Sequence, residues 1–348
     1  MNPEEFARQL NHVMVDLLLQ GGQIKTLDVE KAFRKVLRHK FLPKGMNIAE
    51  VYQDKTIILK QSATDGLPLS SSTMPGLLAS ILEAANLKPG MRVMQIGTGP
   101  GYLAALIGHL VTASGAVVTI EVDADIAKTA REQLDYMSYG NIQCVVTDGS
   151  LGYTQQAPYQ RIIVSASCAN VPEAWMDQLE ENGLLILPFS LSQRASLYPM
   201  LSFKKTGNHF IGKVASSLVT VGFIPLCGKH VTYQVLYEKS ITKVETSVFR
   251  NLRDHYKGTD YKAIALIVLL EIAKATELMP EGIDTLEPME LTARSINLWK
   301  QLKNPRIEDF RFYLLPRTQT IGSYIWHFSK EHNQLFVTVR SNRPDDEK

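Results

Sequence analysis

The sequence predicts an α/β protein with a doubly wound, mostly parallel sheet, an antiparallel edge hairpin and a smaller C-terminal α+β domain. The first observation is an alternation, between residues 92 and 187, of short apolar runs with amphipathic segments of helical period. Such alternation is typical of a parallel sheet with helices on both faces. The second observation is a glycine cluster at residues 97–101, directly after the first apolar run, and the third is Glu121, which ends the second run. Together they predict the strand, tight turn and helix of a nucleotide-binding loop.

The length and composition of the chain indicate how many domains it has and what class of protein it is. A chain of 348 residues exceeds one average domain, and 45% hydrophobic with 21% charged residues is ordinary for a globular protein. We expect an N-terminal helical cap over residues 1–60, a cofactor-binding domain over 61–228 and an accessory α+β domain over 229–348. The net charge of +2 indicates no nucleic-acid partner.

The sequence also predicts where the protein works. Residues 1–30 lack a basic segment followed by an apolar core, so we expect no signal peptide and a cytoplasmic location. The apolar run at 263–272 is too short to span a bilayer, which predicts no membrane partner. Cys144, Cys168 and Cys227 lie far apart without metal-ligand spacing, so we expect buried free thiols and no metal.

The first 60 residues predict two helices. One begins at Pro3, and a second begins at Thr26 or Asp28 and is closed by residues 38–43, because the residue before a proline leaves helical geometry. We expect these helices to cover a site. The first should bury one apolar stripe of helical spacing, formed by Phe6, Leu10, Val13 and Leu17.

Residues 56–59 predict a short extended segment, and residues 64–68 a turn. The serine-rich residues 69–72 read as a polar loop. Thr73 is the expected cap of a helix with Pro75 in its first turn. The apolar face of that helix is predicted to be Leu77, Leu78, Ile81 and Leu82.

The alternating region predicts further strands and helices after the glycine loop. We expect strands at 116–120, 142–146, 161–165 and 184–187, and helices after the loop and at 124–137 and 172–179. Ligands of such sheets bind beyond the carboxyl ends of the strands. Glu121, Asp148 and Ser165 all follow strand ends, so the sequence predicts that they line one site.

Glycine spacing indicates the kind of ligand. A dinucleotide fingerprint needs Gly or Ala where this chain has Tyr102. The Gly-x-Gly-x-Gly pattern suits a nucleoside without phosphates, such as S-adenosylmethionine, with Glu121 accepting from the ribose hydroxyls and Asp148 close to the adenine amino group. The predicted cofactor contacts are Gly97, Thr98, Gly99, Gly101, Tyr102, Glu121, Val122, Asp148, Gly149 and Ser165.

The residues after 187 are predicted to form a hairpin, further strands and two helices. Residues 196–203 and 210–221 should form a hairpin about a turn at 204–208. In the C-terminal part we expect helices at 263–275 and 291–302. The expected strands there lie at 231–237, 244–249, 310–315, 324–328 and 335–339, before a polar tail at 342–348.

Up to about residue 228 the chain resembles the protein-L-isoaspartate O-methyltransferase family. The resemblance rests on six ordered matches: RHKFLP at 38–43, GTGPGYL at 97–103, TDGSLGY at 147–153, APYQRI at 157–162, VPEAWMDQL at 171–179 and FIPL at 223–226. It implies a class I, Rossmann-like methyltransferase fold that uses S-adenosylmethionine. It also implies a peptide or protein substrate that carries aspartate or isoaspartate.

The family has a serine beside the substrate carboxylate, and that serine corresponds to Ser71. The resemblance therefore implies a catalytic role for Ser71 and substrate contacts for Ser70, Ser72 and Thr73. The segment departs from the family pattern, because the proline two positions after the serine is absent and Met74 replaces the usual histidine. The triple serine, residues 51–55 and the C-terminal extension resemble a branch that methylates an aspartate of lanthipeptide precursors.

The sequence thus favours a carboxyl O-methyltransferase. A carboxylate with a pKa near ~4 is already ionised, so no general base is required. His39, at a helix end, reads as a capping or packing residue. Two alternatives stay open: a methyltransferase of small molecules, since a fold does not fix the acceptor, and a cofactor-binding module without activity whose C-terminal domain recruits a partner. The oligomeric state is open as well.

Overall fold

The computed structural model describes residues 2–64, 66–191, 198–215, 221–227, 249, 252, 258–278, 288–329 and 333–340. The chain divides into two compact units. The first contains residues 1–165, 177–186 and 227–230, and the second contains residues 166–176, 187–226 and 231–348. The expected three-part division at residues 60 and 228 stays a prediction.

The first unit is built on parallel strands in the order β7-β6-β3-β4-β5. Their bounds are β3 Arg92–Ile96, β4 Ala116–Glu121, β5 Ile142–Val146, β6 Tyr159–Val164 and β7 Leu179–Pro188. The chain leaves β3 toward β4 on one side and later returns to β6 on the other. The carboxyl ends of β3 and β6 therefore mark the topological switch point, where open α/β sheets bind ligands.

Helices connect and cover these strands, and they confirm the predicted α/β fold. They are α4 Pro75–Ala85, α5 Tyr102–Val111, α6 Ala124–Tyr136, α7 Glu173–Gln178 and the short η2 Gly149–Leu151 and η3 Thr154–Gln156. The predicted apolar face of α4 is buried, as are the α5 residues Leu103, Leu106, Ile107 and Leu110. Burial of these faces positions the loop between β3 and α5.

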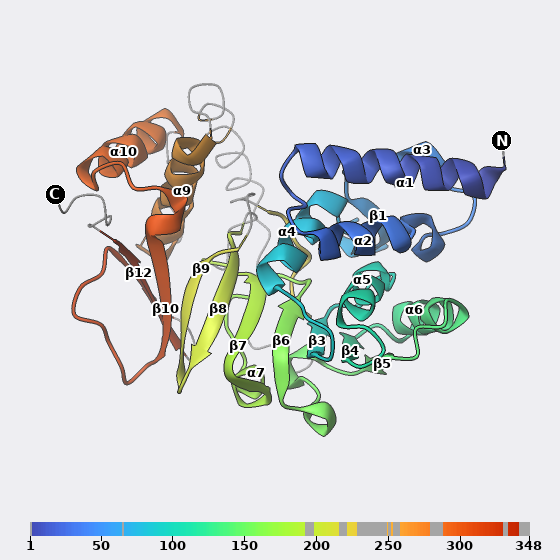
Figure 1. The fold of residues 1–348 in the computed structure, drawn as a ribbon. Coiled ribbons are helices and arrows are strands. Elements are labelled where there is room, and N and C mark those ends of the chain that lie inside the picture. Colours follow the sequence, from blue (N-terminus) through green and yellow to red (C-terminus); the bar gives the residue numbers. More distant parts are fainter. Residues whose placement is uncertain are drawn as a thin grey trace. The chain divides into compact units, whose positions relative to one another are not determined.

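The N-terminal cap consists of α1 Pro3–Gln20, α2 Leu27–Lys35, η1 Arg38–Phe41 and α3 Ile48–Val51. Helix α2 packs on α1, α4 and α5, and α1 and α2 lie outside α4 and α5 (Figure 1). Thr26 is the residue before α2, as expected. Residues 38–43 lie beyond the end of α2, and four of them form η1.

The predicted inner face of α1 is wrong. Val13 is 55% exposed and Leu17 60% exposed, whereas the buried residues are Ala7, Asn11, Met14, Val15 and Leu18. Both stripes have helical spacing, and the buried one was not recognised because it contains the polar residue Asn11. Its Nδ2 donates there to the carbonyl oxygens of Phe33 and Arg34, whereas its buried Oδ1 has no hydrogen-bond partner among the described residues.

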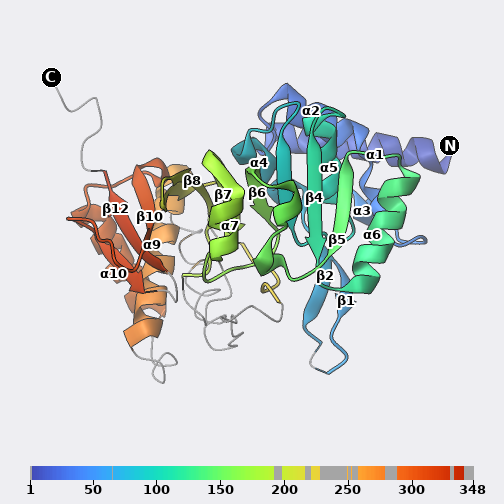
Figure 2. The same cartoon turned by 90° about the horizontal axis from the view of Figure 1, so that it is seen from below.

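A two-stranded antiparallel sheet, β1 Ile57–Gln61 with β2 Pro68–Ser72, follows the cap along the chain and precedes α4. The prediction of a loop at residues 69–72 is therefore wrong. The predicted cap is also wrong, because Met74 precedes α4 and makes no side-chain capping bond. The hairpin extends past the end of the parallel strands (Figure 2).

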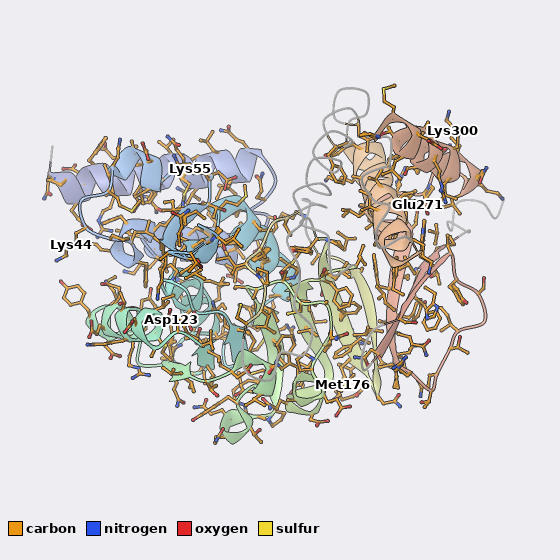
Figure 3. The ribbon with its side chains drawn as sticks, turned by 180° about the vertical axis from the view of Figure 1, so that it is seen from behind. Lys44, Lys55, Asp123, Met176, Glu271 and Lys300 are labelled. Atoms are coloured by element: carbon orange, nitrogen blue, oxygen red, sulfur yellow. The ribbon has the colours of Figure 1, made fainter. Side chains whose placement is uncertain are left out.

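The second unit contains the antiparallel strands in the order β11-β12-β10-β9-β8. Its elements are β8 Met200–Thr206, β9 His209–Val214, α9 Gly258–Leu278, α10 Pro288–Gln301, η5 Ile307–Asp309, β10 Phe310–Pro316, β11 Trp326–Ser329 and β12 Asn333–Val339. The predicted hairpin and C-terminal elements of the described residues are confirmed. Glu271, labelled on α9 in Figure 3, accepts from Trp326 Nε1 at 2.9 Å and pairs with Arg294 at 3.0 Å.

Some predictions lie outside the described residues, namely the strand at 231–237, residues 244–248 and the tail at 342–348. Phe249, placed by prediction in a strand, has helical geometry. Cys144 and Cys168 are buried free thiols, but Cys227 is exposed, contrary to expectation. Among the described residues no helix is long and apolar enough to cross a membrane.

Candidate active site at the carboxyl edge of the parallel strands

The glycine loop after β3 has the backbone that the sequence predicts. Gly97, Gly99 and Gly101 have φ values of +87°, +52° and +88°, a region that side-chain-bearing residues rarely adopt. Each glycine also faces a different neighbour. A Cβ on Gly97 would lie 3.4 Å from Ser165 Cβ, and one on Gly99 would lie 3.3 Å from the Ser71 carbonyl oxygen. A Cβ on Gly101 would contact α6 at 3.5 Å.

Two buried polar side chains support this loop from inside the sheet. Thr98 Oγ1 lies 2.8 Å from Thr119 Oγ1, and Thr119 donates to Gln95 Oε1 at 3.2 Å. Gln95 Nε2 in turn donates to the Gly97 carbonyl oxygen at 2.8 Å. The Thr98 side chain is therefore engaged within the protein. Gln95 and Thr119 were missed in the sequence because each stands inside an apolar strand run.

Glu121 ends β4 beside the glycine loop. Its Oε2 accepts the Gly99 N–H at 3.1 Å, and Oε1 accepts the N–H groups of Val122 at 3.0 Å and Asp123 at 3.3 Å. Burial raises the pKa of the Glu121 carboxyl, and the three N–H bonds offset that rise only in part. An acid held at this strand end is placed to accept from ribose hydroxyls.

Asp148 follows the neighbouring strand β5 and caps η2. Its Oδ1 accepts from Ser150 N at 2.9 Å and from Ser150 Oγ at 2.7 Å, and Gly149 behind it is buried. The Thr147 N–H donates to the Glu121 carbonyl at 3.1 Å, so the two strand ends lie side by side. Val122 is 48% exposed next to Glu121, an apolar surface that suits a flat ring.

Ser165 follows β6, across the switch point from Gly97. Its N–H donates to the Ile96 carbonyl at 2.8 Å. Its Oγ is buried and has no hydrogen-bond partner in the described part of the chain. Buried hydroxyls are normally paired, so this oxygen suits a ligand that brings its own donor or acceptor. Together with the glycine backbone and Glu121, it makes the site fit an adenosyl cofactor.

Tyr102 is placed differently from the other predicted cofactor contacts. Its side chain is 1% exposed and packs on Phe33, at a ring-centroid distance of 6.3 Å, and on Phe41 at 5.7 Å. The Tyr102 side chain thus anchors the start of α5 to the cap, and only its backbone lies in the loop.

The serine segment lies against the glycine loop. Ser71 is half-buried, with its carbonyl against Gly99, whereas Ser70 and Ser72 on the opposite face of β2 are buried. The Thr73 carbonyl accepts from Arg38 Nη2 at 3.1 Å. The structure thus brings Ser71 together with the predicted cofactor residues. Arg38 was not predicted as a site residue, because nothing in the sequence relates it to residues 72 and 73.

An ion pair fastens the hairpin to the cofactor edge. Lys60 Nζ of β1 lies 2.5 Å from Asp123 Oδ2, at the start of α6, where Figure 3 labels Asp123. Neither residue was predicted, because nothing in the sequence relates them.

His39 serves the cap. Its Nδ1 lies 2.6 Å from Tyr52 Oη, and its Nε2 lies 3.4 Å from Glu4 Oε2. Burial lowers the His39 pKa. Both ring nitrogens are engaged by cap residues, which agrees with the packing role expected for this histidine.

Residues 8–231, nearly two thirds of the chain, match the family model described as protein-L-isoaspartate(D-aspartate) O-methyltransferase. A protein-L-isoaspartate O-methyltransferase of Methanococcus maripaludis is 34% identical over 224 residues, which cover 64% of this chain and 98% of that protein. One of Ignicoccus hospitalis is 35% identical, covering 60% and 93%. A third, from Thermotoga maritima, is 34% identical and covers 56% and 61%.

Solved structures are similar as well. One described as a protein-L-isoaspartate O-methyltransferase superimposes with a TM-score of 0.60 at 19% identity, covering 94% of this chain and 99% of that chain. A Plasmodium falciparum structure, described as a putative protein-L-isoaspartate O-methyltransferase in complex with S-adenosyl-L-homocysteine, has a TM-score of 0.51 at 22% identity. It covers 62% of this chain and 97% of that chain.

Proposed function

The chain belongs to the protein-L-isoaspartate(D-aspartate) O-methyltransferase family, and on this premise we propose that it methylates a side-chain carboxylate, of isoaspartate or aspartate, in a protein or peptide. The observation that carries the proposal is the contact between Ser71 and Gly99, which joins the acceptor segment to the cofactor loop. Family membership supports the reaction class, carboxyl methylation dependent on S-adenosylmethionine.

The residues present fit that cofactor. Gly97, Gly99 and Gly101 leave the backbone open, Glu121 is placed for the ribose, and Ser165 Oγ is buried without a described partner. When bound, S-adenosylmethionine supplies an electrophilic methyl group on a sulfonium. The Plasmodium relative, described in complex with S-adenosyl-L-homocysteine, supports the same assignment.

The chain's own residues would align and shield the acceptor. A carboxylate with a pKa near ~4 is ionised at neutral pH, so it needs no general base. We assign to Ser71 Oγ–H a hydrogen bond to this carboxylate, with the β1–β2 hairpin and the cap excluding water. Alignment of this kind supplies up to about 7–11 kcal/mol of a reaction barrier.

Isoaspartate in proteins is the acceptor that we favour, because the relatives carry that name. Aspartate of a lanthipeptide precursor is the second candidate, supported by the departure of residues 70–74 from the family pattern. The C-terminal extension does not separate the two. The similar structure that covers 94% of this chain, and thus also takes in most of the extension, is itself described as a protein-L-isoaspartate O-methyltransferase.

The test is transfer of labelled methyl to matched peptides that contain isoaspartate or aspartate at one position, followed by mild alkali and collection of volatile methanol. We expect a base-labile ester on the isoaspartyl peptide. An ester found only on an aspartyl precursor peptide would rule out isoaspartate and favour aspartate of a lanthipeptide precursor as the acceptor. Binding of S-adenosylhomocysteine without any ester would contradict carboxyl methylation and favour a non-catalytic module or a small-molecule acceptor.

Ser71→Ala tests the assigned role in the same assay. We expect S-adenosylhomocysteine affinity to stay within about twofold, while methyl transfer falls about tenfold, as the loss of one hydrogen bond to a charged group implies. Equal losses in binding and transfer would rule out the acceptor role of Ser71.

A further inference from the structure

A fully buried arginine lies behind the serine segment. Arg38, in η1, has 0% exposure. Its guanidinium donates to five backbone carbonyl oxygens from two separate stretches of chain. The acceptors are Val51 at 2.9 Å, Gln53 at 3.2 Å, Lys55 at 3.0 Å, Ser72 at 3.1 Å and Thr73 at 3.1 Å.

The guanidinium also reaches a side chain of the serine segment. Nη2 lies 3.3 Å and Nε 3.4 Å from Ser72 Oγ. Ser72 thus offers both its carbonyl and its hydroxyl to the same group. Since Ser71 is the adjoining residue, the guanidinium holds the peptide units that determine where the Ser71 side chain is presented.

This arrangement is unusual for a buried cation. Buried arginines are normally paired with a carboxylate, because an unpaired buried charge is costly. In the described part of the chain no ion pair involves Arg38, and desolvation lowers its pKa. The nearby Asp54 carboxylate accepts the Gly76 N–H at 2.7 Å instead. The fork of five N–H donors is thus used to fix backbone.

We propose that Arg38 is a positioning residue for methyl transfer: it fixes residues 72 and 73 from behind, so that Ser71 is held against Gly99 and presents its hydroxyl to the acceptor carboxylate. The inference rests on the proposed function of Ser71 and goes beyond it. A positioning residue of this kind acts through Ser71 and has no contact with the cofactor.

Arg38→Lys is the main variant. Lysine keeps the charge but has a single donor centre, which cannot satisfy two stretches of backbone at once. Because Arg38 acts through Ser71, we expect kcat/KM for the isoaspartyl peptide to fall by up to about tenfold, the loss expected for Ser71→Ala, while S-adenosylhomocysteine affinity in calorimetry changes less than threefold. Amide hydrogen exchange at residues 70–73 should accelerate in the same variant.

Arg161→Lys is the matched control. Arg161 is half-buried and, like Arg38, donates to backbone, through Nε to Ala85 O at 2.6 Å and Nη1 to Gln160 O at 2.8 Å, near the amino ends of the strands. It should lose stability without a selective loss of methyl transfer. Similar kinetic losses in both arginine variants would reduce Arg38 to a general structural role.

The decisive measurement is a double-mutant cycle with Ser71→Ala. If Arg38 acts through Ser71, the two losses in kcat/KM are non-additive, and the double variant is about as slow as the slower single one. Multiplicative losses would overturn the proposal. Should Arg38→Lys fail to fold, Ser72→Ala removes only the hydroxyl partner, and the same non-additivity with Ser71→Ala is required of it.

The wild-type assay separates the two levels of the argument. No ester on any isoaspartyl or aspartyl peptide would refute the proposed function, and with it this inference. Turnover by the wild type with multiplicative losses would refute the role of Arg38 alone.

Discussion

The carbonyl oxygen of Ser71 lies against Gly99, so close that a Cβ at residue 99 would stand 3.3 Å from it. One of these residues belongs to the strand that carries the proposed acceptor contact, and the other to the loop that fits the cofactor. The two functions therefore share a backbone contact with almost no spare room. Substitutions that enter this gap test whether the geometry is required.

Gly99→Ala should impair cofactor binding. Its φ of +52° makes any side chain strained by about 1–2 kcal/mol, and its Cβ would push against Ser71. We expect S-adenosylhomocysteine affinity to fall tenfold or more in calorimetry. Gly45→Ala is the control, because Gly45 has φ +88° with no atom within 4 Å of the added Cβ. Gly45→Ala should lower the free energy of unfolding by a similar amount and leave S-adenosylhomocysteine affinity unchanged. If the two variants bound S-adenosylhomocysteine equally well, the contact between Ser71 and Gly99 would not be required for cofactor binding.

Glu121→Gln should separate binding from stability. Burial raises the pKa of the Glu121 carboxyl, so ionising this group destabilises the folded protein. The destabilisation is absent below the ordinary glutamate pKa of about 4.3 and grows as the pH rises through the higher pKa of the folded state. The free energy of unfolding of the variant, minus that of the wild type, should therefore increase with pH across this window. Urea titrations at pH 4 to 7.5 measure it.

The same Glu121 variant should bind S-adenosylhomocysteine more weakly at neutral pH. A glutamine offers one acceptor oxygen to a site that uses both carboxylate oxygens. A pH-independent stability difference would show that the carboxylate is not penalised by burial. Unchanged affinity would exclude it from the ribose site.

Tyr102→Phe should stabilise the protein. The Tyr102 hydroxyl is buried without a partner among the described residues, and an unsatisfied buried polar group costs about 1–3 kcal/mol. We expect the free energy of unfolding to rise by about 1 kcal/mol, with cofactor affinity unchanged because the side chain faces Phe33 and Phe41. Weaker cofactor binding in this variant would instead show that the Tyr102 side chain contacts the cofactor, in line with the sequence-based prediction for this residue.

The sequence was sufficient for elements whose pattern is set by the parallel sheet. The strand at residues 142–146 was predicted at its observed bounds, and the α6 start at Ala124 likewise. Strands buried on both faces read as apolar runs, and the glycines that follow are required by backbone geometry. Glu121 and Ser165 were identified as candidates because carboxyl ends of parallel strands converge.

Long-range polar contacts could not be predicted in this way. Arg38 stands in a basic segment that reads as a surface helix end, and only the fold shows that it reaches Ser72. The strand at residues 68–72 was missed because three serines give no contrast of polarity, so its alternating burial leaves no trace in the sequence. Helix α1 has two stripes of the same helical period, and the periodicity alone does not show which is buried. In the folded protein the buried stripe is the one that contains Asn11.

Ile58→Asn should change which peptides are methylated well. Ile58 is the cross-strand partner of Ser71, and directly opposite residues of an antiparallel pair project to the same face. Leu69, two residues before Ser71, shares that face, and the two apolar side chains are 44% and 48% exposed. An apolar residue beside the acceptor in a bound peptide would cover them.

The expected result is an increase in KM of about five- to tenfold for peptides with an apolar residue next to isoaspartate, corresponding to about 1–1.4 kcal/mol of lost burial. Peptides with glycine at that position should change less than twofold. Leu27→Asn is the control, because Leu27 is 60% exposed at the start of α2 and outside the β1–β2 hairpin. An equal increase for both peptide classes would mean that Ile58 supports the strand without touching substrate.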